Sequence, residues 1–343
     1  MPGAREAVPG LDLGRLSTWL SAHVPGAGPE FTVTLIAGGK SNLTYLVADG
    51  DHEWIVRRPP LGHVLATAHD MAREHRVISA LRGTAVPVPT TYDLCEDVDV
   101  IGAPFYVMQR CAGTPYRFAT ELEALGAERT RAISEQLVDT LAALHAVDPP
   151  AVGLADFGRP EGFLARQVSR WKKQLDASRS RDLPAADELY RRISEDVPTE
   201  SAAGIVHGDY RLDNVLVDEH DQITAVLDWE MATLGDPLTD LALMLVYGRL
   251  GAGGNAMAVS TVTAAPGFLT EDEIIARYAA GSERDLSRFG FYLGLAAFKL
   301  AAILEGIYYR HLQGQTVGSG FDDVGEGVDV LLDVGLSAME ENG

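Results

Sequence analysis

Apolar and polar residues alternate over residues 31–36, which is the pattern of a strand with one buried face. Four further strand-like stretches follow in the first 110 residues, with polar or proline-containing breaks among them: residues 43–48, 53–57, 91–95 and 105–109. Between the third and fourth stretches, residues 66–81 place Met71, Ile78 and Leu81 at helical spacing. The pattern therefore predicts five strands and one helix in this part of the chain.

The pattern changes to a mainly helical one after Gly113. Helices are predicted over residues 121–147, 161–175, 185–193, 237–247, 271–281, 284–312 and 322–340, with a short β-rich island at residues 205–229. We therefore expect an α+β fold with two lobes. Residues 1–110 form a small β-rich lobe, and residues 111–343 form a larger, mostly helical lobe.

Composition also indicates whether the protein spans a membrane, is secreted or binds a metal through cysteines. The longest apolar stretch, residues 289–307, contains Lys299 and Glu305, so we interpret it as a buried helix and not as a membrane span. Residues 1–11 lack the apolar segment of a secretory signal. The two cysteines, Cys95 and Cys111, have no metal-ligand spacing. These features predict a cytoplasmic protein.

The formal net charge of −21 bears on the partners. Nucleic acids and anionic membranes require a basic surface, so we expect neither as a partner. The acidity also fits a cationic substrate, but solubility alone would explain it. The sequence leaves the oligomeric state open.

The strongest chemical pattern lies between residues 205 and 230. The run His207-Gly208-Asp209 is followed by Asn214, and the strand-like residues 224–227 end at Asp228. Phosphoryl transfer needs a carboxylate to orient the attacking hydroxyl and oxygen ligands for Mg²⁺. Aspartate and asparagine also cap turns, but the spacing of all three points to chemistry. We expect Asp209 to be the base and Asn214 and Asp228 to be metal ligands.

These motifs resemble those of a known family. The run from His207 to Asn214, then Asp228-Trp229-Glu230 and residues 235–242, is similar to the pattern of aminoglycoside-phosphotransferase-like kinases. Within that family, residues 57–60, 68–75, 86–89 and 102–108 resemble the branch associated with acyl-CoA dehydrogenases. The resemblance extends from about residue 32 to residue 248. It implies a bilobal protein-kinase-like fold, with ATP and Mg²⁺ as cofactors and a small-molecule hydroxyl as the substrate.

The resemblance also implies roles in the first lobe. Arg57 stands on the third strand, where protein kinases carry a phosphate-binding lysine, and Glu74 on the following helix is the expected ion-pair partner. Arginine keeps the positive charge but has a different geometry. The neighbouring Arg58 must point to the opposite face of the strand.

The same resemblance implies that two further stretches contact the nucleotide. Ser41 and Asn42 lie in the turn expected to contact the β- and γ-phosphates. Between the two lobes, Gln109 and Arg110 resemble the kinase hinge whose backbone binds adenine.

Other polar residues are expected to support the catalytic loop, which is the segment from His207 to Asn214. Asp240 resembles the buried aspartate that holds this loop by its backbone, and His207 is expected to brace it. Arg211 either steadies a phosphate or a substrate carboxylate, or is an ordinary loop charge. His145 is expected to be structural.

Several alternatives stay open at this point. The acyl-CoA dehydrogenase branch suggests a hydroxyacyl or hydroxy-acid acceptor, whereas an aminoglycoside-type antibiotic kinase would need an acidic acceptor pocket. A catalytically inactive, nucleotide-binding pseudokinase is favoured only by the arginine at position 57. The sequence does not distinguish ATP from GTP.

Overall fold

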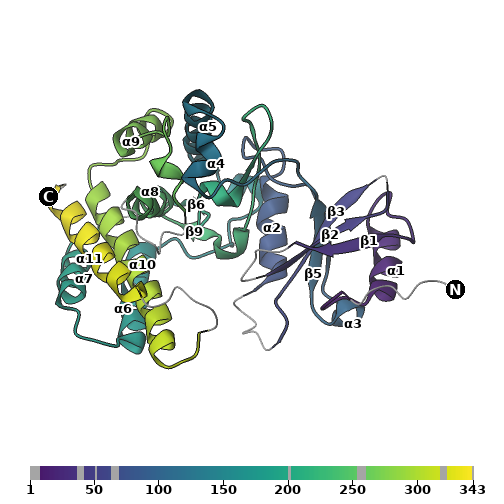
Figure 1. The fold of residues 1–343 in the computed structure, drawn as a ribbon, viewed down its shortest axis with the longest axis horizontal. Coiled ribbons are helices and arrows are strands. Elements are labelled where there is room, and N and C mark those ends of the chain that lie inside the picture. The colour runs from purple at the N-terminus through teal and green to yellow at the C-terminus, as the bar shows by residue number, and fades with distance from the viewer. Residues whose placement is uncertain are drawn as a thin grey trace. The chain divides into compact units, whose positions relative to one another are not determined.

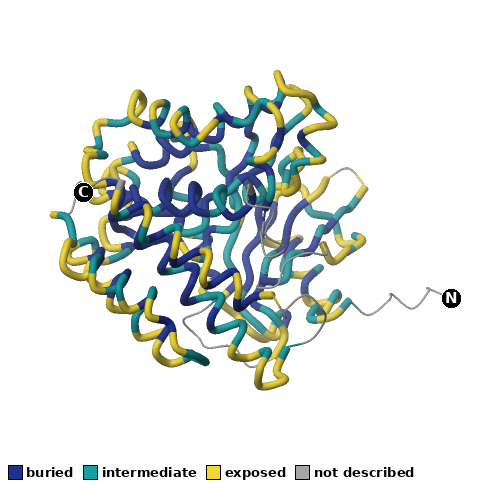
Figure 2. The backbone as a smooth tube through the Cα atoms, turned by 60° about the vertical axis from the view of Figure 1, so that its left-hand side comes forward, coloured by how far each residue is buried: buried dark blue, intermediate teal, exposed yellow. Residues whose placement is uncertain are grey.

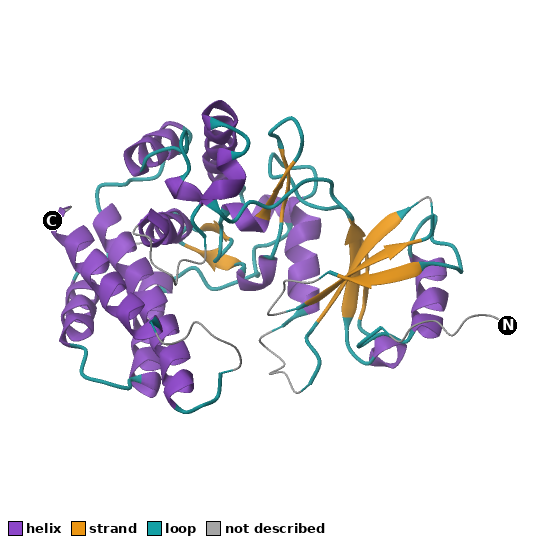
Figure 3. Cartoon of the chain, viewed as in Figure 1, coloured by secondary structure: helices purple, strands orange, loops and turns teal. Residues whose placement is uncertain are grey.

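The computed structural model describes residues 8–36, 42–50, 52–62, 69–199, 202–252, 260–316 and 323–341. The chain divides into two compact units. Unit 1 comprises Met1–Ala112 and Thr224–Ala232, and unit 2 comprises Gly113–Ile223 and Thr233–Gly343. The sequence analysis placed the short segment with Asp228 in the helical lobe, whereas its contacts place it in unit 1. Figure 3 shows most strands in unit 1 and most helices in unit 2.

Unit 1 is built on one antiparallel sheet whose five strands have the order β1-β2-β3-β5-β4. Its elements are α1 (Leu13–His23), β1 (Thr32–Leu35), β2 (Leu43–Ala48), β3 (Glu53–Arg58), α2 (Met71–Leu81), β4 (Thr91–Cys95), α3 (Val98–Ile101), β5 (Phe105–Gln109) and the 3₁₀ helix η3 (Trp229–Met231).

The two faces of this sheet are covered by different helices (Figure 1). Leu16 and Leu20 of α1 join a core that includes Trp54, Val56 and Phe105 from one face. Helix α2 packs on β4 and β5. Because side chains alternate along a strand, the even-numbered residues of β3 face α1 and Arg57 belongs to the other face.

Unit 2 is mainly helical. Its elements are α4 (Ala119–Glu123), α5 (Ala127–Ala146), η1 (Pro150–Val152), α6 (Phe163–Ser178), α7 (Pro184–Glu195), β6 (Gly204–Val206), η2 (Leu212–Asn214), β7 (Val215–Val217), β9 (Thr233–Gly235), α8 (Leu238–Ala252), η4 (Val262–Ala264), α9 (Glu271–Ala280), α10 (Phe289–Leu312) and α11 (Val324–Glu341). Strand β8 (Ile223–Val226) runs from unit 2 into unit 1. Strand β6 pairs with β9, which brings the chain before His207 next to the chain before α8.

The predicted α+β fold is confirmed, with local corrections. Helix α1 was not predicted, although Leu16 and Leu20 have the i, i+4 spacing of a buried helix face. The helix expected from residue 66 begins at Met71, because Asp70 caps it by accepting the Arg73 N–H at 3.0 Å. The single helix expected over residues 121–147 is divided before Ala127, where Gly126 adopts a φ of +91°.

Helix α10 is the core helix of unit 2. By length and composition alone it could cross a membrane, but 72% of its most apolar window is buried inside the fold. It packs against α6, α8 and α11. Figure 2 shows the buried stretches of the chain in dark blue. The prediction of a buried helix at this position is confirmed.

Candidate functional site

Unit 1 brings three of the predicted site residues together. The Arg57 Nε atom lies 2.9 Å from Glu74 Oε1, and its terminal nitrogen donates to Asp228 Oδ1 at 2.5 Å. The Arg57 and Glu74 side chains are 13% and 1% exposed, while that of Asp228 is 33% exposed. The expected Arg57–Glu74 ion pair is therefore present, and it is a largely buried one.

Charge and burial oppose each other in this cluster. Burial raises the pKa of Glu74 to about 7, even though the Arg57 guanidinium acts to lower it. Burial also acts to lower the pKa of Arg57, but Glu74, Tyr106 and Asp228 outweigh it, so the guanidinium stays charged. Asp228 has left-handed backbone angles, with φ 63° and ψ 58°, which a residue with a side chain adopts rarely. Such a conformation is common at functional sites.

Arg58 is held on the other face of the sheet, as expected from strand alternation. Its guanidinium donates to the Ile101 carbonyl at 3.0 Å and also to the carbonyl of Gly10. Only 5% of the residue is exposed. Arg58 therefore ties the sheet to the segments around α1 and α3, and Arg57 is the arginine with carboxylate partners.

Of the two turn residues predicted to contact the nucleotide, the structure describes one. Ser41 lies outside the described residues. The Asn42 residue is 3% exposed, and its side-chain nitrogen donates to Glu230 Oε2 at 3.1 Å, while its Oδ1 is buried without a hydrogen-bond partner in the described chain. Its side chain is thus engaged within unit 1, and only its backbone remains for a phosphate.

At the predicted hinge, part of the backbone already forms hydrogen bonds within the chain. The Gln109 N–H donates to the Thr90 carbonyl at 2.7 Å, so this N–H is not available to adenine. The Arg110 side chain forms an ion pair with Glu53. Phe105 lies on the α1 face, with its ring 4.8 Å from the Trp19 ring, so it is a core residue. A hinge role is left to the Gln109 carbonyl and to the backbone from Arg110 onward.

Unit 2 contains the second cluster, formed by the loop between β6 and η2. The Asn214 side-chain nitrogen donates to the Asp209 carbonyl oxygen at 2.8 Å and to Asp209 Oδ2 at 3.2 Å. These two bonds fix the Asp209 carboxylate relative to its own backbone. They also leave the Asn214 side-chain oxygen as the atom of this side chain with the chemistry of a metal ligand.

A buried aspartate on α8 holds this loop from behind. Asp240 is 1% exposed and accepts the N–H groups of His207 at 2.6 Å and Gly208 at 2.8 Å. His145 lies 3.3 Å from the same carboxylate and 2.7 Å from the Tyr278 hydroxyl. Burial opposes ionisation, but bonds from His145 and the loop N–H groups lower the pKa of Asp240. The loop-holding role expected of Asp240 matches this geometry.

Gly208 and His207 complete the loop. Gly208 adopts a φ of +89°, which favours glycine over a residue with a side chain. The His207 Nδ1 accepts the Asp209 N–H at 3.3 Å, and the His207 residue is fully buried. His207 therefore braces the loop and has no access to a substrate.

Two cations of unit 2 flank Asp209. Arg211 lies 3.3 Å from Asp209 Oδ1 and 3.3 Å from Asp213 Oδ2, and its guanidinium stands 4.7 Å from the centre of the Tyr247 ring. Lys299 on α10 donates to the Gly208 carbonyl at 3.1 Å. The sequence analysis treated Lys299 only as an interruption of an apolar stretch. A charged residue inside an otherwise buried helix was the signal that could have identified it.

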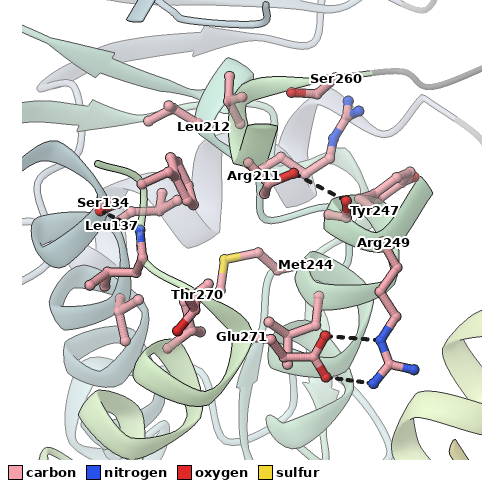
Figure 4. Close-up of a pocket in the computed structure, with 18 residues that line it drawn as sticks. Ser134, Leu137, Arg211, Leu212, Met244, Tyr247, Arg249, Ser260, Thr270 and Glu271 are labelled. Carbon is pink, nitrogen blue, oxygen red and sulfur yellow. Dashed lines mark hydrogen bonds and ion pairs between the residues drawn. The ribbon is translucent and has the colours of Figure 1, made fainter. Parts of the chain in front are cut away.

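A cavity of about 190 Å³ lies beside the loop, within unit 2. Its lining is mostly apolar, and in Figure 4 the Met244 side chain extends into it. Glu271 is the one acidic residue among its lining residues, and it is paired with Arg249 at 2.9 Å and 2.5 Å. Among the described lining residues, the cavity therefore offers no carboxylate that lacks an arginine partner.

The donor chemistry of the site fits Mg²⁺. In the described part of the chain, no group of three or more His, Cys, Asp or Glu side chains is arranged to hold a metal by itself. Mg²⁺ in kinase-type sites takes only one or two protein oxygens and completes its shell with phosphates and water. The carboxylate of Asp228 in unit 1 and the amide oxygen of Asn214 in unit 2 are groups of that chemical kind.

The comparisons with known proteins agree with this architecture. A family model described as a phosphotransferase enzyme family, APH, matches residues 32–290. Acyl-CoA dehydrogenase family member 11 from Rattus norvegicus is 34% identical over 335 residues, which is 95% of this chain and 43% of that protein. The chain therefore spans less than half the length of this relative.

Solved structures show the same fold. One from Ralstonia eutropha, whose name assigns it provisionally to the aminoglycoside phosphotransferases, is 32% identical with a TM-score of 0.86, covering 97% of this chain and 99% of that one. An aminoglycoside phosphotransferase APH(4)-Ia variant, in complex with ADP and hygromycin B, is 15% identical with a TM-score of 0.62, covering 94% and 97%. The latter likeness concerns the fold alone.

The chain belongs to the APH phosphotransferase enzyme family. The resemblance to the branch associated with acyl-CoA dehydrogenases is confirmed by the similarity to the rat protein.

Proposed function

We propose that this chain is an ATP- and Mg²⁺-dependent kinase that phosphorylates a hydroxyl group on a small molecule. The observation that carries the proposal is the Asp209 carboxylate, which Asn214 fixes at 3.2 Å on a loop anchored to Asp240. Family membership supports phosphoryl transfer as the reaction. Unit 1 is then the nucleotide-binding lobe, and unit 2 is the catalytic and acceptor-binding lobe.

In the proposed reaction Asp209 accepts a hydrogen bond from the acceptor hydroxyl and then its proton. The acceptor oxygen forms a bond to the γ-phosphorus, the bond from that phosphorus to the bridging oxygen breaks, and ADP leaves with the electron pair. Asn214 and Asp228 would hold Mg²⁺, which neutralises charge on the phosphates when bound. Arg57, oriented by Glu74, would contact the phosphates. We also propose that the nucleotide is contacted by Ser41, Asn42, Gln109 and Arg110, as the sequence predicts.

For the acceptor we propose a hydroxyacyl or hydroxy-acid compound. Similarity to a protein named for acyl-CoA supports this class. The apolar lining of the cavity beside Arg211 and Leu212 favours it over an aminoglycoside. A cytoplasmic location and the absence of nucleic-acid or membrane partners stay predictions from composition and charge.

The test is phosphate transfer from labelled ATP to a panel of hydroxyacyl compounds, aminoglycosides and choline-like alcohols. Asp209→Asn should abolish turnover of whichever acceptor the unmodified chain uses, and should change nucleotide affinity by less than about 3-fold, because the carboxylate acts on the acceptor proton. Asp176→Asn, on the surface of α6, is the matched control and should keep full activity.

Two outcomes would contradict the proposal. Full activity of Asp209→Asn would remove the base from the mechanism. ATP binding by the unmodified chain without transfer to any member of the panel would favour the pseudokinase alternative.

A further inference from the structure

Lys299 places its side-chain amino group beside the loop that bears Asp209, and among the described residues no carboxylate forms an ion pair with it. Its Nζ donates to the Gly208 carbonyl at 3.1 Å and stands 5.6 Å from the centre of the Trp171 ring. The residue is only partly exposed. A charge removed from water is normally paired, because desolvation is costly.

The carboxylates nearest to Lys299 are engaged elsewhere. Asp209 contacts Arg211 and Asn214 through its two oxygens. Asp240 is buried and directs both oxygens to backbone N–H groups of the loop. Both charges act on Lys299 only at longer range. The Lys299 ammonium group can therefore still pair with an anion.

One neighbouring cation adds positive charge near Lys299, where Asp209 and Asp240 supply negative charge. Arg170, exposed on α6, is close enough for its charge to act on Lys299. Burial and this like charge lower the pKa of the Lys299 ammonium, whereas Asp209 raises it. The net charge of −21 belongs to the whole chain, but the groups around Asp209 decide which charge an acceptor must carry.

We propose that Lys299 binds a negatively charged group of the acceptor, so that the acceptor is a hydroxylated organic anion and a polycation is excluded. This inference rests on the proposed kinase function and makes its acceptor class specific. Lys299 forms and breaks no bond in the reaction. It acts as a specificity-determining residue beside the base, Asp209.

The experiment compares three acceptors that share a carbon skeleton: a hydroxycarboxylate, its methyl ester and the corresponding amino alcohol. A coenzyme A thioester of the same hydroxy acid forms a fourth arm, because its anionic charge lies on phosphates instead of a carboxylate. The variants are Lys299→Met, which removes the charge at similar length, and Lys299→Arg, which keeps it. Lys173→Met, an exposed lysine of α6, is the matched control.

We expect Lys299→Met to raise KM for the anionic acceptor about 10- to 100-fold, which is the loss of one hydrogen bond to a charged group. KM for the methyl ester and for ATP should change less than about 3-fold, since neither depends on this contact. Lys299→Arg should retain most of the preference, and Lys173→Met should behave like the unmodified chain. The arm that responds identifies the anion as carboxylate or phosphate.

Three results would overturn the inference. The first is a preference of the unmodified chain for the amino alcohol. The second is an equal loss of kcat on every acceptor in Lys299→Met, which would make the lysine a support of the loop. The third is a rise in KM for ATP alone, which would assign Lys299 to the γ-phosphate.

The inference is also separable from the kinase proposal. If no acceptor is phosphorylated, binding of the unreactive alkyl carboxylate and alkylamine is measured by calorimetry in the presence of ADP. Carboxylate binding that is lost in Lys299→Met would support the anion site even though the kinase proposal had failed. Amine binding, or no dependence on Lys299, would overturn it.

Discussion

The most informative single change outside the reacting groups is Asp240→Asn, because it keeps the shape of a buried side chain and removes its charge. The carboxylate accepts the N–H groups of His207 and Gly208 at 2.6 Å and 2.8 Å, one with each oxygen. An asparagine offers one oxygen and one NH₂ group. One of the two loop N–H groups would therefore face another donor in a site that is 1% exposed.

The expected cost follows from these contacts. Losing one charge-assisted hydrogen bond and leaving a buried donor without a partner should together lower the free energy of unfolding by about 3 kcal/mol. The loop bearing Asp209 should also lose its fixed position, and a displacement of about 1 Å at a reacting group lowers turnover about 100-fold. We therefore expect both stability and kcat to fall.

Urea denaturation followed by tryptophan fluorescence measures the first quantity, and transfer from labelled ATP measures the second. The control is Asp139→Asn on α5, whose 55%-exposed carboxylate pairs with Arg277 at 2.7 Å. Exposed ion pairs contribute about 0 to 1 kcal/mol, so this change should have little effect. If Asp240→Asn were as stable and as active as the control variant, the proposed anchoring of the loop by Asp240 would be refuted.

Two further predictions concern the cluster of unit 1. Arg57→Met removes the positive charge proposed to contact the phosphates, so nucleotide affinity measured by calorimetry should fall about 10- to 100-fold, with Arg57→Lys intermediate; unchanged affinity in Arg57→Met would dismiss a phosphate-binding role. Burial raises the pKa of Glu74 from 4.5 to about 7 in the folded chain, so the folded state binds the proton more tightly and stability is lost as the pH rises through about 7. The free energy of unfolding should thus fall by up to about 3 kcal/mol between about pH 4.5 and about pH 7 relative to Glu74→Gln, and parallel urea curves for the two proteins would contradict this.

Much of the fold was predictable because local patterns agree with tertiary contacts. The alternation in β2 and β3 marks the two faces of a sheet, and it placed Arg57 and Arg58 on opposite faces as observed. Helix α1 was not predicted because only two of its residues, Leu16 and Leu20, are fully buried, which is a short apolar signal. Its role becomes clear only once the sheet that it covers is known.

The candidate site was predictable to a similar extent. Asp209 and Asn214 are five residues apart on one loop, so their contact could be expected, and the contact of Asp240 with this loop followed from the family resemblance. The placement of Lys299 next to Gly208 could not, because it depends on how α10 packs across a distance of 91 residues. The engagement of the Asn42 side chain by Glu230 likewise joins segments that are 188 residues apart.

A crystal structure with Mg²⁺ and a non-hydrolysable ATP analogue would test the central claim most directly. We predict that the Asp228 carboxylate and the Asn214 side-chain oxygen each lie about 2.1 Å from a bound Mg²⁺ that also contacts the phosphates. We further predict that the Asp209 carboxylate is free of the metal and faces the acceptor side. A nucleotide bound with Asp228 directed away from every cation, or with no metal near Asn214, would contradict the assignment of this chain as a phosphoryl-transferring enzyme.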